Sequence, residues 1–303
     1  MSESCPIFIV SLKKDTDRRR QISKALSSQA LPFTIVDAIE GAKLTQGDMP
    51  WFESANSGKF DVKASGMNEI ACSLSHQSIY QHIVKNDIEW ALILEDDVII
   101  DKKLFPLIKA LEQGKSNLLK KDYVYLLGGQ EGLSSRKRIL LSFFNKITIA
   151  NVTFHLLTYS PDKIFRACCY LIHRNTCKRI ITEFERQFFV ADSWGLLYKK
   201  QAIKGHYLAE IIKHPIVSVE NSNLEADRRK NVIKEKRITR GNLESALAYI
   251  LLQIRRIIKG FIDFLSRPKI SALLIEFKIT LFSCVRSSTD RCFSNLYLAT
   301  YFM

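Results

Sequence analysis

The sequence lacks three features that would each assign the protein to a class. It has no uncharged apolar run of about 18 residues, so we expect no membrane-spanning helix. Its seven cysteines include no C-x-x-C pair and are odd in number, so we expect a reducing compartment and neither a disulfide framework nor a zinc site. The first residues carry no basic segment, and the apolar stretch 7–12 is too short for a signal peptide. We therefore expect a cytoplasmic protein.

Length and composition predict a folded chain with one main domain. Of the 303 residues, 47% are hydrophobic and 25% are charged, which is a globular mixture rather than a disordered one. Such a chain buries enough apolar surface to offset the entropy lost on ordering. One large domain, or one domain with a small annex, is the expected organisation.

Charge is unevenly distributed along the chain. The formal net charge is +14, and residues 225–303 carry more than half of it, with 15 basic and 7 acidic side chains. A basic excess favours an anionic partner, which is a nucleic acid, an anionic lipid surface or a phosphorylated substrate. The sequence has no helix-turn-helix, zinc or RNA-recognition signature. We therefore expect no nucleic-acid partner. A basic nucleic-acid-binding protein is kept as the alternative function.

Short apolar segments alternate with helical patterns over residues 1–224. Expected strands are 6–12, 33–38, 90–95, 123–127, 167–173, 207–211 and 216–220. Expected helices are 17–28, 68–84, 102–113, 175–184 and 192–200. This alternation predicts an α/β domain with a mostly parallel sheet over 1–224. Residues 39–66 are expected to be mainly loop, and residues 130–165 show no assignable pattern.

From about residue 225 the pattern changes. A polar, charged stretch is followed by two segments, 243–265 and 270–285, whose apolar residues fall on one helical face, with Arg255, Arg256 and Lys259 away from it. We interpret 225–303 as a basic amphipathic helical region. It lies either on an anionic membrane surface or against protein, where it packs on the main domain or forms a homodimer.

The sharpest local feature is a triplet of carboxylates, Glu95, Asp96 and Asp97, after a buried apolar strand. Adjacent carboxylates repel one another unless a cation neutralises them. Oxygen ligands suit Mg²⁺ or Mn²⁺, which commonly bridge to substrate phosphates. Ligands of open α/β sheets bind at the carboxyl ends of strands, where this triplet falls. The alternative is a solvated acidic turn.

A second feature is the expected helix 68–84. Ser75, His76 and Tyr80 lie near one face, with His76 and Tyr80 spaced i, i+4. This face presents hydrogen-bond donors to a ligand, or else His76 is a structural residue.

Together these segments resemble glycosyltransferase family 25, the lipooligosaccharide galactosyltransferase family, whose other branch includes the procollagen galactosyltransferases. The similarity covers roughly residues 5–220. The matching segments, in the family's order, are IFIVSL at 7–12 with DRR at 17–19, VDAIEG at 36–41, NEIACSLSH at 68–76 and ALILEDD at 91–97, with weaker matches at 167–172, 191–194 and 214–215.

The resemblance implies a fold and a reaction. We expect a single catalytic domain of the glycosyltransferase-A type and an inverting enzyme that uses a nucleotide sugar, UDP-galactose in most relatives, with Mn²⁺ or Mg²⁺. The expected acceptor is the oligosaccharide of a lipid-linked lipooligosaccharide or lipopolysaccharide, reached from the inner face of the plasma membrane. Hydroxylysine in a protein, as in the procollagen branch, is the alternative acceptor.

The resemblance also assigns roles to individual residues. The expected metal ligands are Asp97 and His214, with Glu95 or Asp96 on the metal or the ribose. The nucleotide-sugar site is expected to include Ser11, Leu12, Arg18, Arg19, Ser75, His76, Glu95 and Asp96. Inversion needs a base for the acceptor hydroxyl, and the candidates are Asp192 and Glu131. Trp194 is expected to stack on the acceptor sugar. The alternatives are a helix N-cap for Asp192, a structural His214, and solvated helix charges for Arg18 and Arg19.

Overall fold

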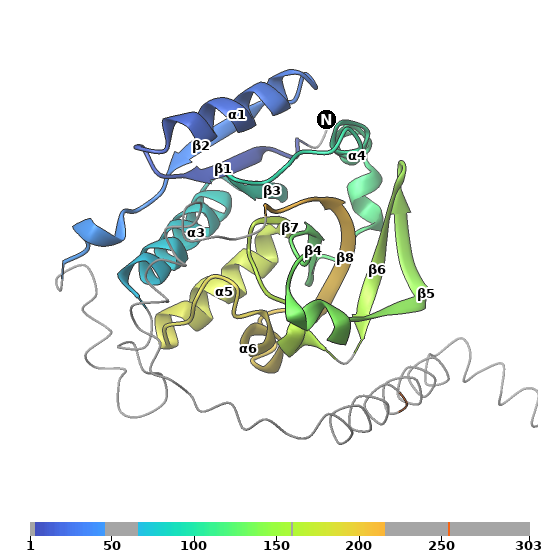
Figure 1. Ribbon diagram of the computed structural model, residues 1–303. Helices are drawn as coiled ribbons and strands as arrows, with labels where there is room; N and C mark the ends of the chain where they lie inside the picture. The colour runs from blue at the N-terminus through green and yellow to red at the C-terminus, as the bar shows by residue number, and fades with distance from the viewer. Residues whose placement is uncertain (1–3, 46–65, 159, 216–253, 255–303) are drawn as a thin grey trace, which may run out of the picture. The chain divides into compact units, whose positions relative to one another are not determined.

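A computed structural model describes residues 4–45, 66–158, 160–215 and 254 (Figure 1). The described part of the chain contains one eight-stranded sheet in the order β2-β1-β3-β7-β4-β8-β6-β5. Its strands are β1 (Ile7–Ser11), β2 (Phe33–Asp37), β3 (Trp90–Glu95), β4 (Tyr123–Gly128), β5 (Leu140–Ile149), β6 (Val152–Thr158), β7 (Cys169–His173) and β8 (Gly205–Ile212). The α-helices are α1 (Thr16–Ser27), α3 (Met67–Lys85), α4 (Leu104–Glu112), α5 (Arg174–Arg186) and α6 (Trp194–Lys199). Short 3₁₀ turns are η1 (Gly41–Lys43), η4 (Lys115–Leu118), η5 (Ser134–Arg138) and η6 (Pro161–Lys163).

The α/β class predicted from the sequence is confirmed, but the expectation of a mostly parallel sheet is wrong. β1 pairs in parallel with β2 and β3, and β4 pairs in parallel with β8. The other four pairings are antiparallel, because β7 lies between β3 and β4 and a β5–β6 hairpin extends the sheet beyond β8. An apolar run reports burial on both faces, which strands of either direction can have. Direction is set by the connections between strands.

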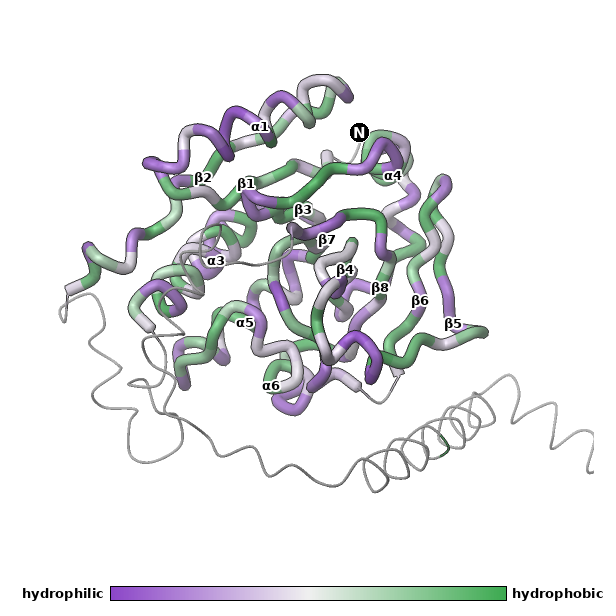
Figure 2. The backbone as a smooth tube through the Cα atoms, viewed as in Figure 1, coloured by the Kyte–Doolittle hydropathy of each residue, from purple (hydrophilic) through white to green (hydrophobic). Residues whose placement is uncertain are grey.

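Helices cover both faces of the sheet, and β1 shows how the sequence divides between them. Alternate side chains of a strand point to opposite faces. Ile7 and Ile9 join a core with α1 and α4, while Phe8 and Val10 join the core beneath α3, α5 and α6. Figure 2 shows apolar colour along much of the central sheet and polar colour along much of α1.

The β5–β6 hairpin occupies the stretch that the sequence leaves unassigned. Ile149 pairs with Val152 across a two-residue turn, and Ala150 adopts a left-handed φ of 48° there. Phe143 and Phe144 on β5 are 86% and 64% exposed. Exposed aromatic residues at adjacent positions obscure the alternation of apolar and polar residues by which a half-buried strand is recognised.

Several expectations fall outside the described residues. These are the strand 216–220, the domain boundary at 224 and the amphipathic helices over 243–285. Among the residues that the structure describes, no helix is both long and apolar enough to cross a membrane.

His206 on β8 is an ionisable residue that lies in the core. Its side chain is fully buried against Trp194, with ring centroids 5.6 Å apart, and neither ring nitrogen has a hydrogen-bond partner. Burial lowers the pKa of His206 from 6.5 to about 3. The native state therefore holds this ring neutral under conditions in which the unfolded chain protonates it.

The burial of His206 predicts that acid lowers the free energy of unfolding, and that a His206→Leu variant lacks this part of the pH dependence. Between the two pKa values the unfolded state binds more protons, so the free energy of unfolding falls as pH falls below 6.5. We expect a wild-type loss of about 2 kcal/mol from His206 between about pH 7 and pH 5, measured by urea unfolding at each pH. The exposed His82→Gln variant is the control and should keep the wild-type slope. An unchanged slope in His206→Leu would contradict the assignment.

Candidate active site

The candidate site lies at the edge of the sheet where parallel strands β1 and β3 end. Val10 is the register partner of Glu95, so the last residues of both strands lie side by side. β3 is buried along Trp90–Leu94 and ends at Glu95, where the acidic triplet begins. The pairing therefore places Ser11 and the segment after β1 next to the triplet.

Asp96 is held inside this edge by β1 and α1. Its Oδ2 accepts a 2.5 Å hydrogen bond from the Ser11 hydroxyl, and its Oδ1 lies 3.4 Å from an Arg18 guanidinium nitrogen. The side chain is only 8% exposed, and burial raises its pKa. The hydrogen bond and the ion pair fix the orientation of Asp96, and the same Arg18 nitrogen lies 3.8 Å from Asp97 Oδ2.

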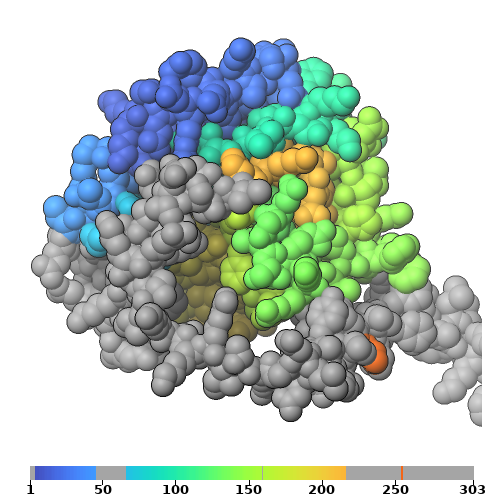
Figure 3. Space-filling view, in the orientation of Figure 1, coloured from blue at the N-terminus to red at the C-terminus, as the bar shows by residue number. Residues whose placement is uncertain are grey.

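Asp97 meets His214, which arrives from the other end of the chain. The bridge between Ile99 and Lys213 joins the segment after β3 to the segment after β8, and Figure 3 shows these segments (teal and orange) meeting at the surface. His214 Nε2 lies 3.4 Å from Asp97 Oδ2. His214 Nδ1 donates to the carbonyl of Pro215 at 2.7 Å, which leaves a lone pair on Nε2 of the neutral ring.

Glu95 completes this group. One ligand atom from each of Glu95, Asp97 and His214 lies within 4.8 Å of the others. Burial, followed by the charge of Glu95, raises the pKa of Asp97 to about 6. Burial also acts to raise the pKa of Glu95, but His76, His214 and Arg166 together hold it below its usual value. Two carboxylates this close oppose each other's ionisation, and a cation between them would remove that repulsion.

Two cavities flank the acidic triplet. The smaller, of about 130 Å³, lies between the end of β1, the segment after β2 and the start of α3, and its lining includes Ser11, Leu12 and Cys72. The larger, of about 440 Å³, lies on the α1 side and is lined by His214. Arg18, Asp96 and Asp97 line both cavities. A ligand in either cavity therefore meets the same carboxylates and the same guanidinium group.

Two residues expected in the nucleotide-sugar site have structural contacts instead. Arg19 binds the Ser11 carbonyl at 2.7 Å and Asp37 at 2.7 Å, so it joins the ends of β1 and β2. The Ser75 hydroxyl donates to the Ala71 carbonyl and accepts from the Ile39 amide, which fixes α3 to the segment after β2. Neither side chain lines a described cavity at the triplet. In this structure both side chains position the backbone around the site, and their role as ligand contacts stays a prediction.

The expected acceptor residues are joined through Arg166. The backbone amide of Arg166 donates to Asp192 Oδ2 at 2.9 Å, and its guanidinium group donates to the carbonyls of Gly129 and Glu131. Its charge also lowers the pKa of Glu95. The role of Asp192 or Glu131 as a base stays a prediction.

Trp194 does not form a platform for a sugar. Its side chain is fully buried, packs against Tyr170 and His206, and donates from Nε1 to the Arg166 carbonyl at 3.1 Å. The expectation that an acceptor stacks on it is wrong for this conformation, because the indole faces are covered by protein. In the sequence, a tryptophan beside a polar loop looks the same whether it packs in the core or stacks on a sugar.

Sequence reasoning missed three residues at the site. Cys72 lines the smaller cavity, Tyr170 hydrogen-bonds His76 Nδ1 at 2.7 Å, and Arg166 influences Glu95. The i, i+4 spacing of Cys72 and His76 is a signal that was available. Tyr170 and Arg166 lie on a segment remote in sequence and carry no such signal.

An α/β domain with carboxylates and a histidine at the carboxyl edge of its sheet is suited to binding a divalent cation with a phosphorylated ligand. Comparison with known proteins gives the family. The chain belongs to glycosyltransferase family 25, described as an LPS biosynthesis protein family, whose profile matches residues 4–194. The resemblance seen in the sequence is thereby confirmed. The match contains the acidic triplet and Asp192, whereas His214 lies beyond it.

Individual relatives are distant. The chain is 24% identical over 163 residues to the human inactive glycosyltransferase 25 family member 3, covering 51% of this chain and 26% of that protein. It is 27% identical over 117 residues to human procollagen galactosyltransferase 2, covering 36% of this chain and 19% of that protein. The chain thus spans about a fifth to a quarter of the relatives' length. A solved glycosyltransferase involved in glycosylating the major capsid of PBCV-1 aligns with a TM-score of 0.38 and 9% identity, over 75% of this chain and 98% of that one.

Charge repulsion in the triplet predicts that Asp97→Asn stabilises the metal-free protein. Above about pH 6 the ionised Asp97 lies beside Glu95 and destabilises the fold, so removing its charge should raise the free energy of unfolding by about 1–2 kcal/mol at pH 7.5 and by less at pH 5. Mn²⁺ should raise the melting temperature of wild type and not of the variant.

The measurement is thermal unfolding with chelator and with Mn²⁺. Asp17→Asn is the matched control, because Asp17 is exposed on α1. Equal stabilisation of Asp97→Asn and wild type by Mn²⁺ would exclude Asp97 as a ligand.

Proposed function

We propose that this protein is an inverting, cation-dependent glycosyltransferase that transfers galactose from UDP-galactose to the oligosaccharide of a lipid-linked acceptor. The observation that carries the proposal is the group of Glu95, Asp97 and His214 between two cavities that share Asp97. Membership of glycosyltransferase family 25 supplies the reaction class.

The residues present fit a divalent cation. Asp97 Oδ1 is buried with no hydrogen-bond partner, and His214 presents the Nε2 lone pair on the other side of the same carboxylate. Carboxylate oxygens with one imidazole suit Mn²⁺ or Mg²⁺. Glu95, Asp97 and His214 would hold the ion, which supplies positive charge for the leaving diphosphate when bound.

The chain's own residues orient the donor. Arg18 lines both cavities and offers a fixed positive charge to a diphosphate, since its ion pairs with Asp96 and Asp97 hold it at the triplet. Asp96, which is already fixed by Ser11, can accept a hydrogen bond from a ribose hydroxyl in the smaller cavity. These contacts place the bond that breaks next to the acidic edge, where charge develops.

The identities of the donor sugar and the acceptor are inferred from the relatives and from the description of the family. Several of the relatives are procollagen galactosyltransferases, which supports galactose as the transferred sugar. The description of the family as LPS biosynthesis supports a lipooligosaccharide or lipopolysaccharide acceptor. A protein is the second candidate acceptor, because the relatives' names indicate procollagen as a substrate; hydroxylysine is the acceptor residue that the family resemblance leads us to expect.

The proposal predicts cation-dependent UDP release from one nucleotide sugar. UDP release is measured for UDP-galactose, UDP-glucose and UDP-N-acetylhexosamines, with Mn²⁺ or with chelator, and with a lipooligosaccharide or a hydroxylysine peptide as acceptor. We expect the highest rate with UDP-galactose, Mn²⁺ and lipooligosaccharide. Asp97→Asn should lower that rate by a factor of about 10² or more, while Asp17→Asn should retain it. Wild-type activity that chelator leaves unchanged would contradict the role of the metal. UDP release stimulated by the peptide and not by lipooligosaccharide would favour a protein acceptor instead.

We also propose that the basic C-terminal region holds the enzyme at an anionic membrane surface beside its acceptor, on the inner face of the plasma membrane. The support is the sequence pattern alone, with Arg255, Arg256 and Lys259 flanking a continuous apolar face.

Membrane binding is tested with the full chain and a charge-reversal variant. Each basic side chain near an anionic surface contributes about 1 kcal/mol, so changing these three residues to Glu should weaken binding to anionic liposomes by a factor of about 10² or more. Co-sedimentation at rising fractions of anionic lipid measures the effect. Three exposed lysines of the catalytic domain, Lys13, Lys14 and Lys102, changed to Glu provide the control. Equal binding by wild type and both variants would contradict the membrane role and favour contact of the C-terminal region with protein.

A further inference from the structure

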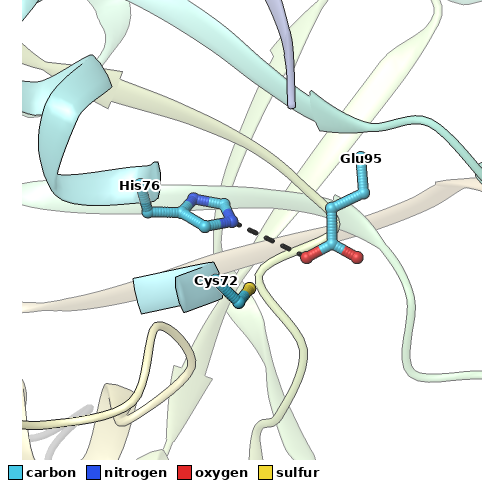
Figure 4. A group of neighbouring side chains, drawn as sticks. All are labelled: Cys72, His76 and Glu95. Atoms are coloured by element: carbon cyan, nitrogen blue, oxygen red, sulfur yellow. Dashed lines mark ion pairs between the residues drawn. The ribbon is translucent and has the colours of Figure 1, made fainter. Parts of the chain in front are cut away.

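A second group of potential metal ligands lies on the α3 side of Glu95. Cys72 and His76 are four residues apart on α3, so their side chains lie one above the other on one helix face. Figure 4 shows both side chains directed toward Glu95 at the end of β3. One ligand atom from each of the three residues lies within 4.8 Å of the others.

The imidazole of His76 is oriented for a ligand. The residue is 1% exposed, and Nε2 has no hydrogen-bond partner. Glu95 Oε1 lies 3.7 Å from Nε2, which is too far for a hydrogen bond. Nδ1 lies 2.7 Å from the Tyr170 hydroxyl, which in turn lies 2.6 Å from the Tyr80 hydroxyl. When Nδ1 donates to Tyr170, the lone pair of Nε2 points toward Glu95, as in histidines that ligate metals.

The donor set has the chemistry of a zinc site. A thiolate, an imidazole and a carboxylate together select Zn²⁺ over Mn²⁺ or Mg²⁺, which prefer oxygen ligands. Zinc bonds of about 2.0–2.3 Å place neighbouring ligand atoms of a tetrahedron roughly 3.3–3.8 Å apart. The 3.7 Å separation of His76 Nε2 and Glu95 Oε1 already falls in this range. Cys72 and Glu95 also line the smaller cavity, which gives the ion an entry path and a fourth position for water.

We propose that Cys72, His76 and Glu95 form a Zn²⁺ site on the α3 side of Glu95, contrary to the expectation drawn from the missing C-x-x-C pair. Zinc binding releases the Cys72 thiol proton to solvent and leaves a thiolate on the ion. Glu95 belongs to both groups, so a zinc ion on the α3 side engages a carboxylate that the other group also uses. The site itself does not depend on the proposed transferase activity.

The test is Co²⁺ binding to the full-length protein, because cobalt replaces zinc and a cobalt–thiolate bond gives a charge-transfer band in the near ultraviolet. We expect one thiolate-bound Co²⁺ per wild-type chain and loss of the band when Zn²⁺ is added. Cys72→Ser should abolish the band. Asp97→Asn should retain it, since Asp97 belongs only to the other group. Cys177→Ala is the thiol control and should also retain it, because Cys177 is buried on α5.

The outcomes separate this proposal from the previous one. No thiolate band in wild type, or a band that survives in Cys72→Ser, overturns the zinc site and leaves an ion pair between His76 and Glu95. Thermal unfolding shows whether Cys72→Ser is folded, and Glu95→Gln provides a second variant that should weaken Co²⁺ binding by a factor of about 10 or more. No readout uses transferase activity, so loss of the proposed function leaves this result unaffected.

Discussion

Three adjacent carboxylates at the end of a buried strand repel one another, and the contacts around them offset that repulsion in different ways. Asp96 accepts a hydrogen bond from Ser11 and pairs with Arg18. Glu95 and Asp97 instead have histidines beside them, and one oxygen of Asp97 has no partner. Protein groups therefore contact all three carboxylates, and the unpartnered oxygen of Asp97 is the atom left to bind a further positive charge.

Distance along the chain separates the groups that provide this compensation. Arg18 comes from α1, His76 from α3, and His214 from the segment after β8. They meet because β1 and β3 are parallel neighbours and because Ile99 bridges Lys213. The functional edge is consequently a product of sheet order, and a change in strand pairing would disperse it.

Glu95 is the residue on which the two candidate cation groups converge. It ends β3 and has His76 and Cys72 on one side and Asp97 with His214 on the other. The two sides differ in ligand chemistry, since one offers sulfur and the other offers oxygen. The ligand atoms on each side of Glu95, rather than Glu95 itself, would therefore decide which cation each proposed site prefers.

The α/β class, most strand and helix positions, and the acidic edge with Asp97 could be predicted from the sequence, because periodicity and an abrupt end to an apolar run are local signals. Through the family resemblance the sequence also named His214 and Asp97 as candidate metal ligands, and the two side chains lie 3.4 Å apart. The sequence did not predict that the sheet is mixed, that Arg19 and Ser75 bind backbone, or that Trp194 is buried. These properties depend on which remote segments become neighbours, and sheet order and burial are set by packing across the whole domain rather than by residue type or spacing.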